Sequence, residues 1–299
     1  MNDSPKTAAN VGRISVVMVS YMTGPALLES IKAVQADPDI DELIIVDNGN
    51  HADARTLFFE AAQRTDKVRI LQGHGNVGFA KGCNYGAAMA SGDYLYFLNP
   101  DAVTETGAAR KLADALSDWP APCLAGGLLL SSTGDEQRGA RRGALTAASA
   151  FASFTPLHRL PGIRSIHRDD EPLPEAPVPM PTVSGASIMM ERQTFDQLGG
   201  FDEGYFLHVE DIAICRAIRA AGGTVIFVPG ARALHHGSTS NVPRWRVEWH
   251  KLKGFIRYFW TAGPGVRVKL GTVLGAPLMA AALFGRLAVF SLRKVLQRR

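Results

Sequence analysis

The first half of the chain alternates short apolar runs with segments whose apolar residues recur at helical spacing. Runs rich in β-branched residues occupy 14–21, 41–48, 67–73 and 92–100, and helical patterns lie between them. Short, nearly continuous apolar strands separated by helices are typical of a parallel sheet covered on both faces. The pattern therefore predicts an α/β fold in which helices flank such a sheet.

The pattern changes after residue 138. Residues 139–181 are rich in Arg, Pro and Ala and show no sustained period, so we expect a long flexible loop that passes over the site. Strand-like and helical segments resume at 182, and the strand "TVIFVPG" follows. Two helices separated by Gly-Pro-Gly are expected over 244–299. We therefore predict one α/β domain over 1–243 and a separate helical region over 244–299.

Charge is concentrated in that last region. The whole chain has a formal net charge of +4, yet residues 244–299 hold twelve Lys and Arg against one acid, Glu248. Such a region attracts phosphates, on nucleic acid or on an anionic membrane, although a solvated basic face is the ordinary alternative. No nucleic-acid-binding motif accompanies the charge, so no nucleic-acid partner is expected.

The uncharged run 270–285 lies inside the basic region. It is shorter than the roughly 18–20 residues that a spanning helix needs. The flanking Arg and Lys, with the aromatic stretch "WHKLKGFIRYFW", favour a helix that lies in the interface of an anionic leaflet. Core packing, a homo-oligomer contact and a true membrane span are the alternatives.

Cysteine usage and the N-terminus bear on the compartment. The three cysteines, Cys83, Cys123 and Cys215, are scattered and odd in number, which suits neither a disulfide framework nor a metal knuckle. The polar start "MNDSPKTAANVGR" lacks the apolar core of a signal peptide. Both features predict a cytoplasmic protein.

Polar residues follow three of the expected strands where each strand ends. In open α/β sheets the ligand sits beyond the carboxyl ends of the strands, so these residues are expected to form a site by position alone. They are Ser20 and Tyr21, Asp47 and Asn48, and Asn99 to Asp101.

Two segments could bind a nucleotide. The carboxylate of Asp47 can accept the imide N–H of uracil or thymine, although capping of the next helix or turn explains it equally well. The segment "GNVGFAKGCNYG" (75–86) would let phosphate approach the backbone at a helix N-terminus, with a tight turn as the alternative. It matches neither G-x-G-x-x-G nor a Walker A loop, which argues against dehydrogenases and kinases.

Three further groups could carry chemistry. Asp101, at a strand end, could bind a divalent cation on a diphosphate, but "NPD" is also a common turn sequence. Glu210 and Asp211 begin a helix, where a carboxylate is either an ordinary cap or a general base. His235, in "ALHHGSTS", is either structural or a further metal ligand.

In chain order, "VDN", "GNVGFAKGCNYG", "FLNPD", "GGFDEGYFLHVED" and "HHGSTS" resemble the family 2 glycosyltransferases with the GT-A fold, and above all the bacterial rhamnosyltransferase-like branch. The resemblance spans roughly residues 13 to 260 and implies a mixed, mainly parallel, Rossmann-like sheet. It also implies inverting, metal-dependent transfer of a sugar from a nucleotide-diphosphate donor.

Position by position, the resemblance implies that Asp47 recognises the base and Asp101 is the metal-binding acid of a D-x-D motif whose first acid is here Asn99. It implies that Asp211, paired with Glu210, is the catalytic base. His235 resembles the further metal ligand, with His236 as the alternative. The substrate-binding residues expected are Ser20, Tyr21, Asp47, Asn48, Asn76, Gly78, Lys81, Asn84, Asn99 and Gly185.

The resemblance further implies Mg²⁺ or Mn²⁺, dTDP-L-rhamnose as donor, and a polyprenyl-diphosphate-linked glycan as acceptor in cell-surface polysaccharide assembly. UDP-galactofuranose and UDP-N-acetylglucosamine are alternative donors. With the basic tail, these expectations place the protein at the inner face of the cell membrane. A nucleotidyltransferase and a non-catalytic glycan-binding protein are the rival functions.

Overall fold

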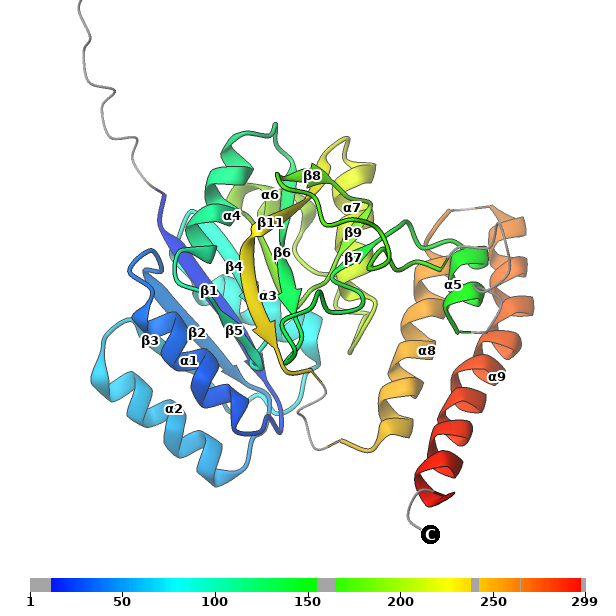
Figure 1. Cartoon of the computed structure of the whole chain (residues 1–299), viewed down its shortest axis with the longest axis horizontal. Coiled ribbons are helices and arrows are strands. Elements are labelled where there is room, and N and C mark those ends of the chain that lie inside the picture. Colours follow the sequence, from blue (N-terminus) through cyan, green and yellow to red (C-terminus); the bar gives the residue numbers. More distant parts are fainter. Residues whose placement is uncertain (1–11, 155–164, 238–241, 264, 297–299) are drawn as a thin grey trace, which may run out of the picture.

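The computed structural model describes residues 12–154, 165–237, 242–263 and 265–296. The N-terminal segment 1–11, which bears on the predicted lack of a signal peptide, lies outside the described residues. The strands (Figure 1) are β1 Ile14–Ser20, β2 Glu42–Asp47, β3 Val68–Leu71, β4 Tyr94–Leu98, β5 Ala102–Thr104, β6 Cys123–Leu130, β7 Arg141–Arg142, β8 Val178–Pro179, β9 Thr182–Val183, β10 Ser187–Glu191 and β11 Thr224–His235. The helices are α1 Ala26–Ala36, α2 Ala52–Arg64, α3 Phe79–Met89, α4 Ala108–Ser117, α5 Ala147–Phe154, α6 Arg192–Leu198, α7 Glu210–Ala220, α8 Arg244–Trp260 and α9 Val266–Leu296.

Within the described residues, nine strands form one mixed sheet in the order β3-β2-β1-β4-β10-β6-β11-β5, with β8 paired to β11. β1 to β4 run parallel to one another, and β6 runs parallel to β11. β10 lies antiparallel between β4 and β6 and so joins the two parallel parts. The predicted sheet flanked by helices is confirmed.

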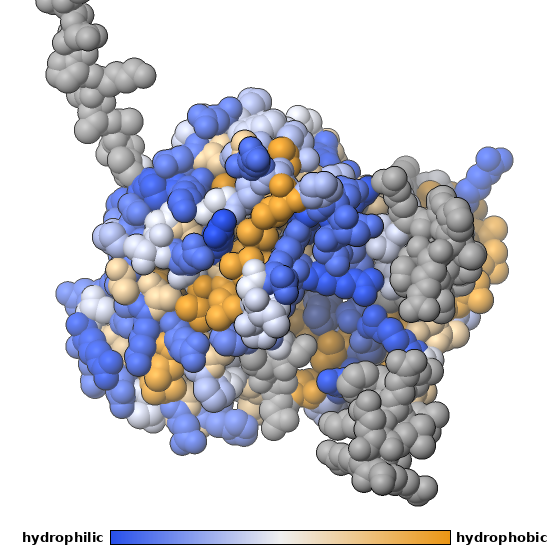
Figure 2. Space-filling view, in the orientation of Figure 1, coloured by the Kyte–Doolittle hydropathy of each residue, from blue (hydrophilic) through white to orange (hydrophobic). Residues whose placement is uncertain are grey.

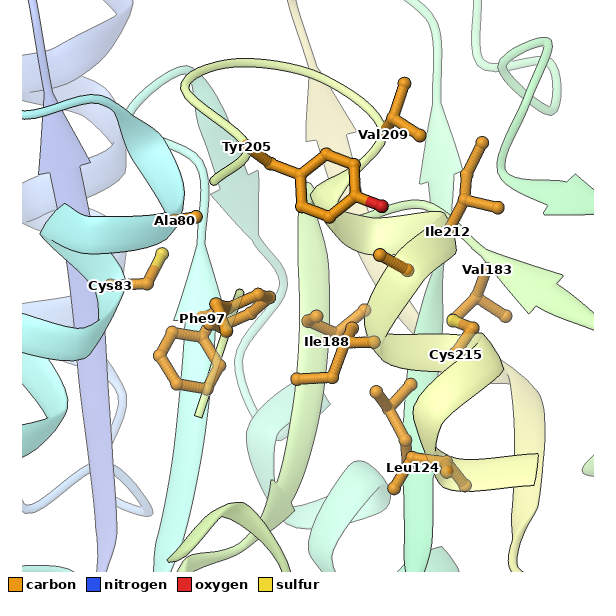
Figure 3. Close-up of a cluster of buried hydrophobic side chains, with 14 of the residues drawn as sticks. Ala80, Cys83, Phe97, Leu124, Val183, Ile188, Tyr205, Val209, Ile212 and Cys215 are labelled. Carbon is orange, nitrogen blue, oxygen red and sulfur yellow. The ribbon is translucent and has the colours of Figure 1, made fainter. Parts of the chain in front are cut away.

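Alternate residues of β1 serve two cores, because side chains of a strand point to opposite faces. Ile14, Val16 and Met18 pack with α1, α2 and α4, whereas Val17 and Val19 pack with α3, α6 and α7. Figure 3 shows the second core, where side chains of α3, β4 and α7 gather. All of β1 and β2 is buried, which explains their continuous apolar sequence.

β11 is longer than the run 224–230 predicts. Its pairing with β6 shifts between Val228 and Arg232 and then continues to Leu234. Pro229 lies in this irregularity, because a proline has no N–H for the ladder. His235 is therefore the last residue of a strand and not part of a following loop.

The segment 139–181, predicted as a flexible loop, contains β7, α5 and β8, and its residues 155–164 lie outside the described residues. β7 pairs with β9 in a separate two-stranded sheet. These two-residue strands are too short to leave a period in the sequence.

The two expected C-terminal helices are present, and α8 packs along α9 (Figure 1). Leu252, Phe255 and Tyr258 of α8 join the core beneath α3 and α7. Apolar residues of α9 remain exposed, as Figure 2 shows at the right-hand margin. Among the described residues, Val266–Ala288 is long and apolar enough to cross a membrane by length and composition, with a mean hydropathy of 1.6.

Candidate active site

The carboxyl ends of β1, β2 and β4 lie at one edge of the sheet. Ser20, the last residue of β1, is in register with Asp47, the last residue of β2. Asn99 follows β4, which pairs with β1 on its other side. Since neighbouring parallel strands end on the same side, the polar loops after them are brought together.

Asp47 organises the loop after β2. Its Oδ1 accepts the backbone N–H groups of Gly49 and Asn50, each at 2.9 Å, and Asn50 Nδ2 at 2.8 Å. Its Oδ2 accepts Nε–H of Arg55 at 2.9 Å. Burial raises the pKa of Asp47, but these hydrogen bonds outweigh burial and hold the pKa below its ordinary value. The side chain is only 1% exposed, so a nucleobase can reach it only if the half-exposed Arg55 moves aside.

Asn50 ties this loop to the end of β1. Its Oδ1 accepts Oγ–H of Ser20 at 3.1 Å and the N–H of Thr23 at 3.2 Å, and its Nδ2 donates to the carbonyl of Ser20. Ser20 is therefore buried inside the loop pair. Tyr21 is half-buried beside Gly49, whose missing Cβ would stand 3.6 Å from the tyrosine ring.

The turn before α3 requires a glycine. Gly78 has φ +88°, and a Cβ there would stand 2.6 Å from the carbonyl oxygen of Phe206. Asn48 Nδ2 donates to the carbonyl of Gly78 at 2.9 Å, while its Oδ1 lies 3.0 Å from Nε2 of His74. The exposed Asn76 accepts the N–H of Gly78. The expected Asn48, Asn76 and Gly78 thus form one hydrogen-bonded turn.

Two predicted substrate-binding residues of α3 contact the segment before α7. Asn84 donates to the carbonyl of Phe201 and accepts its N–H, both at 2.9 Å. Lys81 Nζ lies 3.5 Å from Glu203 and 5.6 Å from the ring of Tyr85. Both residues hold the 199–205 segment against α3, and a contact of either with substrate stays a prediction.

Asp101, just before β5, lies beside His235, the last residue of β11. His235 is in register with Ala102, and its Nε2 lies 3.2 Å from Asp101 Oδ1 and 3.3 Å from Asn99 Nδ2. The alternative residue, His236, turns toward Glu29 of α1, 3.4 Å away. Of the two histidines, His235 is therefore the one that faces Asp101.

Gln137 determines which nitrogen of His235 faces the carboxylate. Gln137 Nε2 donates to the carbonyl of His235, so Gln137 Oε1 is the atom that meets His235 Nδ1, at 2.6 Å. Nδ1 must then carry a proton, which in the neutral ring leaves a lone pair on Nε2. Nε2 and the Asp101 carboxylate are then two acceptors that face each other.

A divalent cation fits this pair, because imidazole and carboxylate are both ligands of Mn²⁺-type ions. Among the described residues no cluster of three His, Cys, Asp or Glu forms a metal site, so further ligands would come from water or substrate. Asp101, His235 and the nearby amide of Asn99 are the residues that can hold such an ion.

Asp211 and Glu210 begin α7 and differ in protonation. Asp211 Oδ2 forms an ion pair with Arg142 and accepts the N–H of Gly185 at 3.0 Å. Burial raises the pKa of Asp211, but the Arg142 charge and the hydrogen bonds lower it below its ordinary value overall. Burial and the Asp211 charge raise the pKa of Glu210 to about 8. At neutral pH one carboxyl is therefore ionised and the other is mostly protonated, an arrangement typical of acid–base sites.

A strained turn presents these two carboxyls. His208 and Val209 have φ of +66° and +73°, a region that a β-branched residue rarely adopts. α8 packs directly against the turn, because a Cβ at Gly254 would stand 3.0 Å from the carbonyl oxygen of His208. His250 of α8 also stacks on Phe206, with ring centroids 4.4 Å apart.

Several residues of the site are not predicted by the sequence. Gln137, Arg142 and Asn50 orient His235, Asp211 and Asp47, respectively. Asn50 could have been found, because Asp-Asn-Gly-Asn is a typical turn sequence. Gln137 and Arg142 lie far along the chain from their partners, and no local pattern links them.

The profile of Glycosyl transferase family 2 matches residues 15–199, more than half of the chain. The chain belongs to this family. It is therefore a glycosyltransferase, and neither a nucleotidyltransferase nor a non-catalytic binding protein is needed to explain the site. The predicted resemblance is confirmed, and the family match includes the Asp47 and Asp101 loops but ends before α7.

The transferase is similar to N-acetylglucosaminyl-diphospho-decaprenol L-rhamnosyltransferase of Mycobacterium tuberculosis, with 28% identity over 81% of this chain and 83% of that protein. Its fold is similar to GalNAc-T7 with UDP, GalNAc and Mn²⁺, with a TM-score of 0.60, 18% identity and coverage of 87% of this chain and 54% of that one. A mannosyltransferase of Pyrobaculum calidifontis with GDP-Man and Mn²⁺ gives a TM-score of 0.55, 14% identity and coverage of 94% and 75%. These likenesses confirm the GT-A fold.

Gly185→Ala tests whether Asp211 must stay where it is. A Cβ at Gly185 would stand 2.8 Å from Cβ of Asp211, so the carboxylate has to shift. We expect transfer to fall about 100-fold, as misplaced catalytic groups do, while the thermal midpoint changes little. Gly230→Ala is the control, because its nearest neighbour would be 3.6 Å away. Equal activity of the two variants, measured as nucleoside diphosphate release, would contradict a strict position for Asp211.

Proposed function

We propose that this transferase moves L-rhamnose from dTDP-L-rhamnose, with inversion, to a hydroxyl of a polyprenyl-diphosphate-linked glycan in cell-surface polysaccharide assembly. The observation that carries the proposal is the carboxyl pair at the start of α7, in which the ion pair with Arg142 lowers the pKa of Asp211 and burial raises that of Glu210 to about 8. Gly185 and Ala186 connect Asp211 to Asn99, in the turn that also carries Asp101. The name of the Mycobacterium tuberculosis relative supports the sugar and the lipid-linked acceptor.

Asp211 acts as the general base in this reaction. It takes the proton of the acceptor hydroxyl as that oxygen bonds to the anomeric carbon and the bond from this carbon to the diphosphate breaks. Attack opposite the leaving group inverts the anomeric centre. Glu210 keeps its proton and so leaves the single negative charge of the pair on Asp211.

Asp101 and His235 would hold Mg²⁺ or Mn²⁺, which neutralises the charge of a diphosphate leaving group when bound. The Mn²⁺ in the two solved structures of similar fold supports this choice. Asp47 would accept the imide N–H of the base through Oδ2 once Arg55 moves outward. Both thymine and uracil carry that imide, so UDP-galactofuranose and UDP-N-acetylglucosamine are the alternative donors.

Donor binding is measured by titration calorimetry with dTDP-L-rhamnose, UDP-sugars and GDP-sugars, each with and without Mn²⁺ or Mg²⁺. We expect metal-dependent binding of dTDP-L-rhamnose, and a loss of metal dependence in Asp101→Ala because half of the protein's ligand pair is gone. Asp196→Ala, on the exposed side of α6, is the matched control. Equal metal-dependent binding by Asp101→Ala would refute the metal role of Asp101. Preferential binding of another sugar nucleotide would show that dTDP-L-rhamnose is not the donor.

The exposed face of α9 supports contact with an anionic membrane surface at the cytoplasmic side. Its exposed apolar residues are Val266, Val268, Leu270, Val273, Leu274 and Leu278. An ion pair between Glu248 and Arg286, at 3.4 Å, also links the start of α8 to the later part of α9. α8, which packs along α9, is basic and also packs against the core, so it is costly to place in hydrocarbon. An α9 that lies in the membrane interface is therefore favoured over one that spans the membrane.

An apolar cavity of about 420 Å³ lies between α5, α8 and α9. This volume is within the range of ligand pockets, about 300–1,000 Å³. Ile256, Phe259 and Met279 contribute to its wall, and Arg267 is its charged residue. We infer that it receives part of the isoprenoid chain of the acceptor, with Arg267 near the lipid diphosphate.

Membrane contact is tested by sedimentation with vesicles of phosphatidylcholine alone or mixed with phosphatidylglycerol. We expect binding to the mixed vesicles that weakens with salt. Binding of Leu274→Glu should be about tenfold weaker, because an apolar side chain that would enter the membrane is replaced by a charge. Phe59→Glu, at an exposed apolar residue of α2 on the opposite side of the molecule (Figure 1), is the control. If Leu274→Glu instead changes only the mass in solution, α9 is an oligomer contact.

A further inference from the structure

We propose that Arg142 is a positioning residue that holds Asp211 so that Oδ1, and not Oδ2, accepts the proton of the acceptor hydroxyl. The inference rests on the proposed function, since it concerns the same base. It is carried by the hydrogen bonds of the two side chains and by the way β7 is held.

The lone pairs of Asp211 distinguish its two oxygens. A carboxylate oxygen accepts about two hydrogen bonds. Oδ2 has both, from Arg142 Nη2 and from the N–H of Gly185. Oδ1 accepts the N–H of Ile212 at 2.8 Å, and no other described residue donates to it. With the side chain 14% exposed, Oδ1 is the oxygen with capacity for a substrate hydroxyl.

Arg142 can act on Asp211 because it is itself fixed. It is in register with Thr182 of β9, and its Nη2 also donates to the carbonyl of Val183 at 2.8 Å. The neighbouring Arg141 anchors β7 through Glu136, at 2.6 Å. A planar guanidinium that bonds a carbonyl and a carboxylate at once fixes the direction of approach, which a lysine cannot do.

The charges around Asp211 come from three elements. Among the described residues, Arg142 of β7 is the cation that contacts Asp211, and Glu210 and Cys215 of α7 and His208 of the preceding turn are titratable groups that interact with it. Burial lowers the pKa of His208 to about 3 and raises that of Cys215 to about 12, so both are uncharged at neutral pH. Arg142 is therefore the positive charge that keeps Asp211 ionised beside Glu210.

Removing this charge has a defined consequence for the pair. Without Arg142, Asp211 and Glu210 would be two buried carboxyls with no cation in contact with them. The first proton of the pair would then be lost only at a higher pH. Because the reaction needs ionised Asp211, the acidic limb of the pH profile would move upward. A merely structural ion pair would alter stability or overall rate and leave the limb in place.

The experiment measures kcat/KM against pH for wild type, Arg142→Gln, Arg142→Lys and the control Arg138→Gln, an exposed arginine of the same segment. The substrates are dTDP-L-rhamnose and a decaprenyl-diphosphate-linked N-acetylglucosamine. We expect the acidic limb to rise by about one pH unit or more in Arg142→Gln. In Arg142→Lys we expect a limb near that of wild type with a reduced rate, because the charge is kept and the geometry is lost. Arg138→Gln should match wild type.

An acidic limb that stays in place in Arg142→Gln, with transfer still measurable, would overturn the role of Arg142 and leave the proposed function intact. Absence of transfer by wild type would overturn the proposed function itself. Binding of dTDP to each variant shows that it is folded. If Arg142→Gln does not bind dTDP, Arg142→Lys decides the question. An acidic limb in Arg142→Lys that rises as much as is expected for Arg142→Gln would also overturn the inference.

Discussion

Gly185 donates its backbone N–H to Asp211, and the carbonyl of the next residue, Ala186, accepts the N–H of Asn99 at 2.9 Å. Because the Cα atoms of consecutive residues are only about 3.8 Å apart, these two bonds fix the catalytic carboxylate relative to the "NPD" turn. That turn carries Asp101, which His235 contacts. The base and the cation-binding pair are thus connected through two consecutive residues, Gly185 and Ala186, just before β10.

The position of β10 in the sheet brings this connection to the site. β10 is antiparallel between β4 and β6, so its first residue, Ser187, lies opposite Leu98 at the carboxyl end of β4. On the other side of Asp211, the strained turn at His208 and Val209 is held by α3 through Phe206 and by α8 through Gly254. α8 therefore links the apolar α9 to the turn that carries the base, which makes the C-terminal helices part of the site's support.

The elements that sequence predicts well are those whose pattern is local. β1 and β2 are buried along their length and read as apolar runs, and α8 begins and ends where its sequence pattern does. The acidic start of α7 and the "NPD" turn could be predicted as candidate chemistry for the same reason. That Asp101 and His235 lie close together came only from resemblance, since β5 and β11 are distant in the chain.

What could not be predicted depends on contacts between distant segments. The sequence of β7 is two arginines in an irregular stretch, and nothing local shows that Arg141 binds Glu136 while Arg142 turns to Asp211. The bulge at Pro229 lets β11 continue to His235, although proline and glycine suggest a strand end. The sequence suggests that Asp47 accepts a base, yet Arg55, in the first turn of α2, covers its carboxylate.

The central claim is that Asp211, and not its neighbour, takes the proton. The most direct test compares steady-state transfer and dTDP binding in Asp211→Asn and Glu210→Gln. The account predicts that Asp211→Asn loses transfer by about 10²- to 10⁴-fold with unchanged dTDP affinity, and that Glu210→Gln, which resembles the protonated acid, loses far less. Full transfer by Asp211→Asn, or a greater loss in Glu210→Gln, would contradict it.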